Sequence, residues 1–214
     1  MLNMNFDTRV VINTASQEWQ PSPIAGVFRK PLAREDAERG HATSIVRYDE
    51  NTRFREHGHP LGEEIFVLEG IFSDETGNFP AGSYLRNPDG FIHSPFSKEG
   101  CLLLVKLHQF KSGDNEQIRV NTHTTPWLPG IGNLEVMPLH SYKGESTALV
   151  HWPAGEKFQH HVHAGGEEIY VLKGEFIDEH GRYGAGTWIR SPHMSHHTPY
   201  VEQDTIILVK VGHL

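Results

Sequence analysis

The stretch HGHPLGEEIFVLEG (57–70) returns 104 residues later as HVHAGGEEIYVLKG (161–174). At this offset residues 43–107 align with residues 147–211 without a gap, and 25 of the 65 aligned positions are identical. Self-similarity at a fixed period is the mark of a repeated structural unit. The chain therefore arose by internal duplication of a segment of about 100 residues.

The repeat extends upstream of this alignment, where Val10 matches Ile118 at an offset of 108. We expect a first domain at residues 1–107, a polar link HQFKSGDNEQ at 108–117, and a second domain at 118–214. A domain of this size is common for a small β fold.

Short runs of strand-forming residues separated by glycine and proline fill both copies. Examples are EEIFVLEG (63–70) and CLLLVKL (101–107), which return as EEIYVLKG (167–174) and TIILVKV (205–211). Evenly spaced short strands with turn signals are typical of a β-sandwich or barrel. We predict an all-β protein of two similar antiparallel barrels, with PLAREDAERG (31–40) as the one plausible, peripheral helix.

Composition excludes several classes of function. The formal charge is −8, 37% of the residues are hydrophobic, and the basic residues are scattered, so nucleic-acid binding is not expected. No apolar run approaches the roughly 18 residues of a membrane span. The first residues lack the features of a signal peptide, so we expect a cytoplasmic protein. No nucleophile triad, phosphate loop or dinucleotide fingerprint stands in a convincing context.

Histidine dominates the metal-binding side chains, with 16 His against one Cys. His57 and His59 stand two residues apart on a predicted strand, so their side chains share one face. Glu63 and His93 follow at short and long spacing, and every interval is repeated in the second copy. Three imidazoles and one carboxylate suit a divalent transition metal. We predict two metal sites, whose ligands are His57, His59, Glu63 and His93 in the first copy and His161, His163, Glu167 and His197 in the second.

The pattern Gly155-x5-His161-x-His163-x3-Glu167-x6-Gly174 satisfies the first cupin motif in full. The first copy differs only at its first glycine, which is Asn51. With GGEEIYVLKGEF, GTWIRSP and a histidine eleven residues after the glycine of the second motif, the chain resembles the cupin domain of ChrR anti-sigma factors. The resemblance implies two tandem jelly-roll barrels, a bicupin, each with zinc held by the ligands named above. Iron, manganese or nickel are alternatives.

The resemblance does not extend to the N-terminal zinc-binding helical domain of a ChrR anti-sigma factor, which carries a His-x3-Cys-x2-Cys motif. This chain has only Cys101. Inhibition of a sigma factor by the chain alone is therefore not expected. Some stand-alone relatives resemble dioxygenases that cleave carbon–carbon bonds in hydroxyacetophenone-like or diketone substrates.

Two functions therefore remain open. The chain is either a regulatory or sensory metal-binding module with a protein or small-molecule partner, or a non-haem metal-dependent dioxygenase. A storage-like cupin is a third, weaker alternative, and a homodimer is compatible with the sequence.

Several residues near the predicted ligands require a separate interpretation. His160, His193 and His196 have no histidine counterparts in the first copy, so we expect solvent or packing roles for them. Glu64 and Glu168 alternate away from the ligands and are expected in structural ion pairs. The repeat also retains an arginine, Arg86 in LRNP and Arg190 in IRSP. The sequence is compatible with two roles for it, support of the metal ligands or a structural ion pair.

Overall fold

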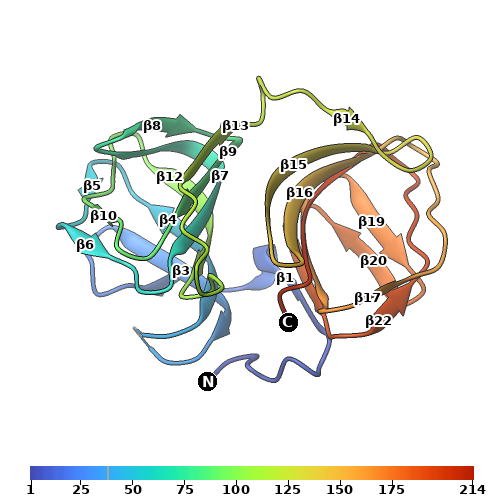
Figure 1. The fold of residues 1–214 in the computed structure, drawn as a ribbon. Helices are drawn as coiled ribbons and strands as arrows, with labels where there is room; N and C mark the ends of the chain where they lie inside the picture. Colours follow the sequence, from blue (N-terminus) through green and yellow to red (C-terminus); the bar gives the residue numbers. More distant parts are fainter. Residues whose placement is uncertain (38) are drawn as a thin grey trace. The chain divides into compact units, whose positions relative to one another are not determined.

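The computed structural model describes residues 1–37 and 39–214, which divide into two compact units (Figure 1). Unit 1 comprises residues 1–4 and 17–125, and unit 2 comprises residues 5–16 and 126–214. Within the described residues the secondary structure is β, apart from one 3-10 turn, η1 (Thr14–Ser16). No helix in that part of the chain is long and apolar enough to cross a membrane.

The strands of unit 1 form one large sheet and a smaller set of short strands that complete the barrel. The large sheet has the order β13-β9-β7-β12-β4-β3-β2. The strands are β2 (Gln20–Pro21), β3 (Val27–Arg34), β4 (Ala42–Tyr48), β5 (Thr52–Arg53), β6 (His57–Gly58), β7 (Glu63–Asp74), β8 (Gly77–Pro80), β9 (Ser83–Asn87), β10 (Ile92–His93), β11 (Phe96–Ser97), β12 (Cys101–Leu107) and β13 (Ile118–Asn121).

Unit 2 repeats this plan with a large sheet of order β1-β21-β18-β23-β16-β15-β14. Its strands are β1 (Val10–Asn13), β14 (Leu128–Pro129), β15 (Glu135–Tyr142), β16 (Glu145–Trp152), β17 (His161–His163), β18 (Glu167–Lys173), β19 (Glu175–Asp178), β20 (Gly181–Gly184), β21 (Thr187–Ser191), β22 (Ser195–His197) and β23 (Thr205–Val211). Position by position, the two sheet orders match, as the sequence repeat predicts.

The edge strands of the two large sheets are exchanged between the sequence repeats. β1 comes from the start of the chain but pairs with β21 of unit 2, with Val10 opposite Arg190. β13 comes from the start of the second repeat but pairs with β9 of unit 1, with Ile118 opposite Arg86. The compact units therefore differ from the sequence ranges 1–107, 108–117 and 118–214 at these segments, because strand pairing places each leading strand in the other unit.

The expected link is also part of unit 1. Phe110 and Asp114 are buried, and Asp114 forms an ion pair with the buried Arg86. The Phe110 ring lies against Gly62, where an added Cβ would come within 2.5 Å of a ring atom. Gly62 also has φ +75°, a backbone conformation that glycine adopts without strain. Gly62 is thus required by its backbone angle and by the chain packed on it.

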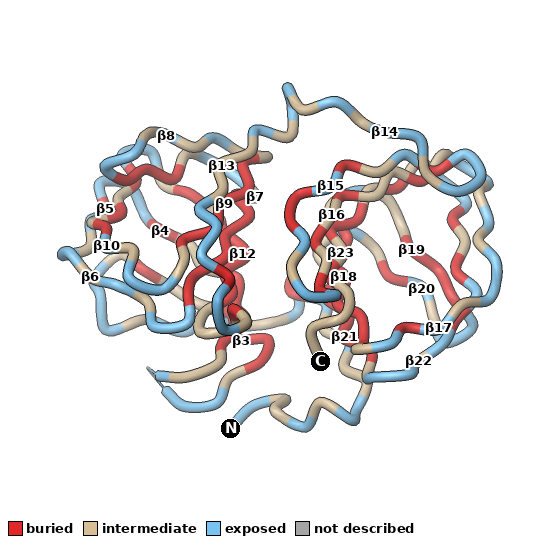
Figure 2. The backbone as a smooth tube through the Cα atoms, viewed as in Figure 1, coloured by how far each residue is buried: buried red, intermediate tan, exposed pale blue. Residues whose placement is uncertain are grey.

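Each barrel has its own apolar core. Buried residues run along β7 and β12 in unit 1 and along β18 and β23 in unit 2 (Figure 2). The unit 1 core includes Ile65, Val67 and Leu103, and the unit 2 core has Ile169 and Val171. These strands are covered on both faces, which explains their nearly continuous apolar sequences.

The expected helix at residues 31–40 is wrong, because none of the residues described there is helical. Residues 31–34 belong to β3, where Leu32 and Ala33 are buried and β3 pairs with β4. Helix propensity is a weak preference, and burial in a sheet overrides it. Residue 38 lies outside the described residues.

Candidate metal centres

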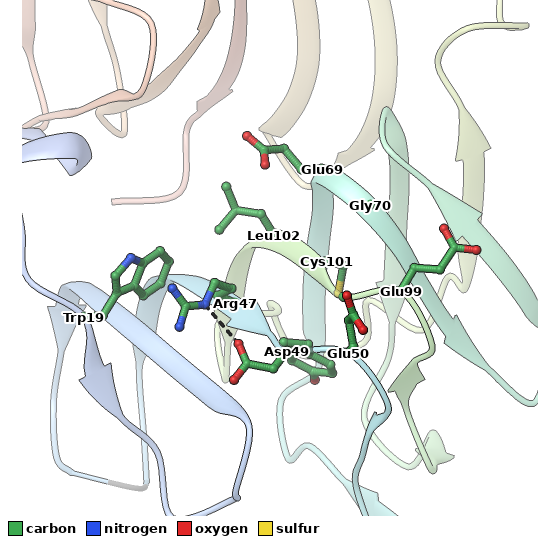
Figure 3. Close-up of a pocket in the computed structure, with 11 residues that line it drawn as sticks. Trp19, Arg47, Asp49, Glu50, Glu69, Gly70, Glu99, Cys101 and Leu102 are labelled. Atoms are coloured by element: carbon green, nitrogen blue, oxygen red, sulfur yellow. Dashed lines mark ion pairs between the residues drawn. The ribbon is translucent and has the colours of Figure 1, made fainter.

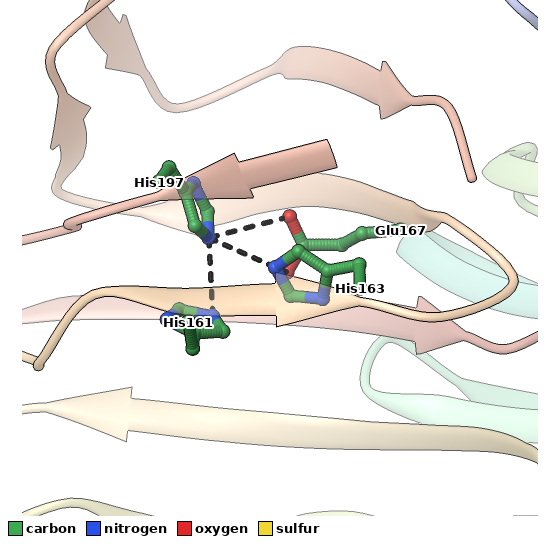
Figure 4. A group of neighbouring side chains, drawn as sticks. All are labelled: His161, His163, Glu167 and His197. Carbon is green, nitrogen blue, oxygen red and sulfur yellow. Dashed lines mark hydrogen bonds and ion pairs between the residues drawn. The ribbon is translucent and has the colours of Figure 1, made fainter. Parts of the chain in front are cut away.

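The four residues predicted as ligands in the second copy meet inside unit 2 (Figure 4). β17 carries His161 and His163 on one face, Glu167 opens β18, and His197 ends β22 opposite His161. The Nε2 atom of His197 lies 3.1 Å from that of His163 and 3.3 Å from that of His161. Each of the four residues contributes one donor atom, and these four atoms all lie within 4.8 Å of one another.

Hydrogen bonds behind two of these histidines orient their lone pairs. His161 Nδ1 lies 3.0 Å from the carbonyl oxygen of Gln159, and His197 Nδ1 lies 3.3 Å from Asp178 Oδ2. Because a carbonyl and a carboxylate only accept, both Nδ1 atoms donate, so in the neutral imidazoles both Nε2 atoms present lone pairs. Two lone pairs facing each other at 3.3 Å repel unless a cation lies between them. This donor set therefore fits a divalent metal ion.

The acid–base properties of the cluster in unit 2 follow from its burial. Burial, reinforced by the nearby Asp178 charge, raises the pKa of Glu167 to about 7. Burial, together with His197 and His161, lowers the pKa of His163 to about 3. Both shifts favour the uncharged forms of Glu167 and His163 in the metal-free cluster. A cation would stabilise the carboxylate and the neutral imidazoles together.

The corresponding residues of unit 1 also converge. The donor atoms of His57, His59 and His93 lie within 4.8 Å of one another. Glu63 places Oε1 at 3.4 Å from His59 Nε2 and Oε2 at 3.5 Å from His93 Nε2. His57 Nδ1 donates to the carbonyl oxygen of Arg55 at 2.8 Å, as its counterpart does in unit 2. All eight residues predicted from the sequence therefore lie at two clusters, although in unit 1 only the three histidines have mutually close donor atoms, and Glu63 contacts two of them.

The two carboxylates have different charged and hydrogen-bonding neighbours. Asn87 Nδ2 donates to Glu63 Oε2 at 2.9 Å, whereas Ser191 occupies the equivalent position beside Glu167. Burial of Glu63 would raise its pKa, but His59, His93 and the Asn87 hydrogen bond outweigh it and lower the pKa. The carboxylate of unit 1 is thus held ready in its charged form.

A buried aspartate behind the last histidine of each cluster was missed in the sequence. Asp178 accepts from His197, from the Tyr183 hydroxyl at 2.9 Å and from Arg9 Nη2 at 3.1 Å. Burial would raise the pKa of Asp178, but the hydrogen bonds from His197, the His180 backbone and Tyr183 outweigh it and lower the pKa to about 2. Such a charged partner fixes the tautomer and orientation of a ligand histidine.

Unit 1 has the same arrangement, with Asp74 Oδ2 at 3.7 Å from His93 Nδ1 and 3.6 Å from Arg119 Nη2. Asp74 and Asp178 are identical residues at the repeat offset of 104, a signal that could have identified them. Arg9 and Arg119 come from different positions of the exchanged leading segments, which a sequence alignment of the repeats does not match.

An apolar cavity of about 270 Å³ opens onto the cluster of unit 2. Its lining includes the ligand side chains His161, Glu167 and His197. The remaining walls are almost entirely apolar, formed by Ile131, Leu134, Val136, Val150, Trp152, Phe158, Phe176, Pro199, Ile207, Val209 and Val211. One side of the cluster thus faces a space from which a small molecule could reach a bound metal.

Unit 1 also has a wider hollow, of about 720 Å³, that contains none of the clustered histidines (Figure 3). Its wall includes Trp19, whose ring lies 4.9 Å from the guanidinium of Arg47, and an ion pair of 3.3 Å between Arg47 and Asp49. Four carboxylates line it, and nothing in the described residues around it resembles a metal cluster. The two histidine clusters lie outside this hollow.

The other residues named from the sequence have structural partners. Arg86 forms ion pairs with Glu64, at 3.3 Å, and with Asp114, while Arg190 donates to the carbonyl oxygen of Asn5 at 3.0 Å. Glu168 accepts from Trp188 Nε1 at 2.7 Å and lies 3.0 Å from His213 Nε2. For Arg86, the ion pair is the role that the structure shows.

Comparison with known proteins agrees with this architecture. A candidate dioxygenase from Nostoc punctiforme is 16% identical, with a TM-score of 0.81 over 96% of this chain and 82% of that chain. The pirin YhhW from Escherichia coli, solved with nickel(II), is 11% identical, with a TM-score of 0.72 over 95% and 98%. A single-residue variant of the oxalate decarboxylase of Bacillus subtilis is 13% identical, with a TM-score of 0.64 over 94% and 76%.

At these identities the structural matches show a shared cupin fold. No curated protein sequence matches the chain. The family model described as the ChrR cupin-like domain matches twice, over residues 7–111 and 115–214. The chain belongs to the ChrR cupin-like family and contains that domain in tandem.

Proposed function

We propose that this protein is a metal-dependent enzyme that oxidises a small, mostly apolar molecule with dioxygen, and that the reaction takes place in unit 2. The observation that carries the proposal is the apolar cavity lined by His161, Glu167 and His197. A purely structural metal site is closed by its ligands, whereas a catalytic site keeps a position open to substrate. Among the structural matches, the candidate dioxygenase supports this reaction class.

The cavity limits the substrate. About 150 Å³ is enough for a benzene-sized ligand, so about 270 Å³ accommodates one ring or a branched chain with a short substituent. The walls provide apolar contacts, and the polar groups lie at the cluster, which favours a molecule with an oxygen-bearing group at one end. Hydroxyacetophenones and short diketones have this form.

The residues of unit 2 have distinct roles in this proposal. His161, His163, Glu167 and His197 would hold the ion, and Asp178 keeps His197 in the tautomer that presents Nε2. A bound redox-active ion such as iron would polarise a substrate carbonyl and provide a position for dioxygen. The apolar cavity beside these ligands is the side from which a substrate would approach the ion. The apolar walls orient the substrate and exclude water from the cluster.

The test combines metal analysis with oxygen uptake. The protein is purified from its native host, its metals are measured, and oxygen consumption is followed with 2-hydroxyacetophenone and pentane-2,4-dione. Iron together with substrate-dependent oxygen consumption supports the proposal. The proposal is refuted if both clusters contain zinc and if the protein consumes no oxygen, both as purified and after its zinc is replaced with iron.

Val136 lies in the wall of the apolar cavity and is the position for a variant that tests whether the cavity is needed. Val136 pairs with Val150 in unit 2, and Arg29 pairs with Val46 at the same place in unit 1. Val136→Arg therefore introduces the residue that the other barrel already carries. We expect oxygen consumption to fall at least tenfold, about 1.4 kcal/mol, while metal content is unchanged.

A regulatory zinc module is the second candidate function. The observation in its favour is that four protein donors can close a tetrahedral zinc shell. Under this alternative the protein would hold zinc in both units and bind a protein partner without turning over a substrate. The same metal analysis and oxygen measurement separate the two candidates.

A further inference from the structure

A second group of metal-binding side chains lies on the outside of unit 2, formed by His160, Glu179 and His196. The donor atoms of these three exposed residues lie within 4.8 Å of one another. In the β17–β22 pair, His161 is opposite His197 and Val162 is opposite His196. Because successive side chains of a strand point to opposite faces, His160 and His196 face away from the inner cluster. The sequence interpretation of these two histidines as solvent or packing residues did not anticipate their meeting with a carboxylate.

The outer group is held in place by the chain around it. The rings of His160 and His196 have centroids 5.1 Å apart. Glu179 Oε2 accepts the backbone N–H of Thr198 at 3.0 Å, and His160 Nδ1 lies 3.3 Å from Thr198 Oγ1. The carboxylate is thereby fixed, and His160 keeps Nε2 available. Two imidazoles and one carboxylate match the preference of zinc, nickel, cobalt and ferrous ions.

Unit 1 provides a natural comparison. Glu75 accepts the backbone N–H of Ser94 at 2.8 Å, just as Glu179 accepts that of Thr198. The fixed carboxylate is therefore a structural feature of both barrels. The histidines are not, because Glu56 and Ile92 stand at the positions of His160 and His196. The outer group belongs to the barrel that also has the apolar cavity.

A small polar cavity beside the inner cluster reaches His196, one of the three residues of the outer group. It measures about 20 Å³, which is enough for about one water molecule. The exposed His196 lines this cavity together with the inner ligands His163, Glu167 and His197. The rest of its wall is polar as well and consists of Arg9, Asp178, His180, Ser191 and Ser195. An ion that exchanges its waters for protein donors is better suited to this polar side of the cluster than to the apolar cavity.

We propose that His160, Glu179 and His196 form an exterior acquisition site for a divalent transition-metal ion, from which the ion passes to the inner cluster of unit 2. This inference rests on the proposed function, because it requires the inner cluster to bind metal. The exterior site captures a hydrated ion with three donors and raises its local concentration beside the polar cavity. The ion then exchanges these donors for the four inner ones, which hold it more tightly.

The first experiment counts metal ions. Metal-free full-length protein is equilibrated with saturating zinc, and bound zinc is measured per chain. We expect three zinc ions in the wild type and two in His160→Ala/His196→Ala. His123→Ala, an exposed histidine of unit 1, is the matched control and should keep three. Two zinc ions in the wild type, or three in the double variant, would overturn the proposal.

The second experiment measures loading. In a His57→Ala/His59→Ala background, cobalt(II) is mixed with metal-free protein, and the absorption bands of the inner unit 2 site are followed with time. We expect His160→Ala/His196→Ala to load at least about tenfold more slowly, as loss of local ion capture predicts, and to reach the same final absorbance. An unchanged loading rate would overturn the acquisition role.

Two further variants separate this inference from the proposed function. His161→Ala/His163→Ala should lose the inner zinc of unit 2 and keep the exterior one. If instead it loses no zinc, the inner cluster is not a metal site, and both proposals fail. Glu56→His/Ile92→His, made beside Glu75, should create a fourth zinc site in unit 1. If this fourth site does not form, two histidines beside a fixed carboxylate are not enough to bind zinc, and the argument for the outer group of unit 2 fails.

Discussion

Replacing Asp178 with Asn should weaken metal binding in unit 2 while leaving unit 1 unchanged. Asp178 Oδ1 accepts from Tyr183 and from the backbone N–H groups of His180 and Gly181. Its Oδ2 faces His197 Nδ1 at 3.3 Å and Arg9 Nη2 at 3.1 Å. Asparagine has one acceptor oxygen, which the Oδ1 donors would occupy. Its amide nitrogen would then face two donors.

This conflict changes the inner cluster through one ligand. To satisfy the asparagine N–H, His197 must move its proton from Nδ1 to Nε2, and it then loses the lone pair directed at the metal. Loss of such a supporting carboxylate typically reduces metal affinity 10- to 100-fold. The expected loss is therefore about 1.4 to 2.8 kcal/mol of binding free energy.

The assay is competition between the protein and a chelator for zinc, in a background where His57→Ala/His59→Ala removes the unit 1 cluster. Unfolding of the metal-free variant is measured in parallel, so that a loss of stability is not mistaken for a loss of affinity. Asp74→Asn, measured in the reciprocal background His161→Ala/His163→Ala, is the matched variant in unit 1, and its effect should be smaller because Asp74 lies 3.7 Å from His93 Nδ1. An affinity within threefold of the wild type in Asp178→Asn would refute the orienting role.

Three further predictions follow from the same geometry. Because burial raises the pKa of Glu167 to about 7 while that of Glu63 is lowered, zinc should leave unit 2 at higher pH than unit 1 as pH falls, measured in single-cluster variants. Equal release curves for the two units would contradict this order of zinc release. In the metal-free protein, the raised pKa of Glu167 should make the fold more stable as pH falls from about 7 to about 4.5, whereas Glu63 should have the reverse effect. Arg9→Ala, which removes one donor to the Asp178 carboxylate, should reduce zinc affinity in unit 2 by about threefold to tenfold, with partial rescue by Arg9→Lys; no effect on affinity would show that Arg9 only stabilises the fold. Gly62→Ala should destabilise the protein by about 1–3 kcal/mol in urea unfolding, whereas Gly184→Ala, where an added Cβ meets nothing within 4 Å, should change stability by less than about 1 kcal/mol.

The sequence predicted the barrels and the clusters because both depend on local spacing. His161 and His163 share a face by the two-residue period of a strand, and the fixed repeat offset carries Glu167 and His197 along with them. The supporting Asp178 was missed because its role depends on a contact with His197 across the fold, which no short motif records. The outer group was missed for a related reason, since His160 and Glu179 meet only when their strands are placed.

Contacts between residues distant in sequence also explain the errors of the sequence interpretation, at residues 31–34 and at the exchanged strands. Residues 31–34 have helix-compatible composition, yet Leu32 is fully buried in a strand of the large sheet. The exchange of β1 and β13 was not predictable from pattern. Val10 and Ile118 are equivalent in the repeat, so either leading strand has the right sequence for either sheet edge.

The strand exchange predicts how the chain behaves when it is cut. Each cluster is supported by a residue from the other repeat, because Arg9, next to β1, reaches Asp178, and Arg119, in β13, reaches Asp74. A protease site inserted at the exposed Ser112–Gly113 turn separates the two repeats covalently but leaves both strand pairings intact.

We therefore expect the two fragments of the cut chain to remain associated in gel filtration and to retain their zinc. They should separate only under denaturing conditions, since release requires removal of β1 from the sheet of unit 2 and of β13 from that of unit 1. Four backbone-paired positions in each exchange hold the fragments together, in addition to the buried ion pair of Asp114 with Arg86. Fragments that separate in native buffer, each with its own zinc, would show that the leading strands do not hold the two repeats together.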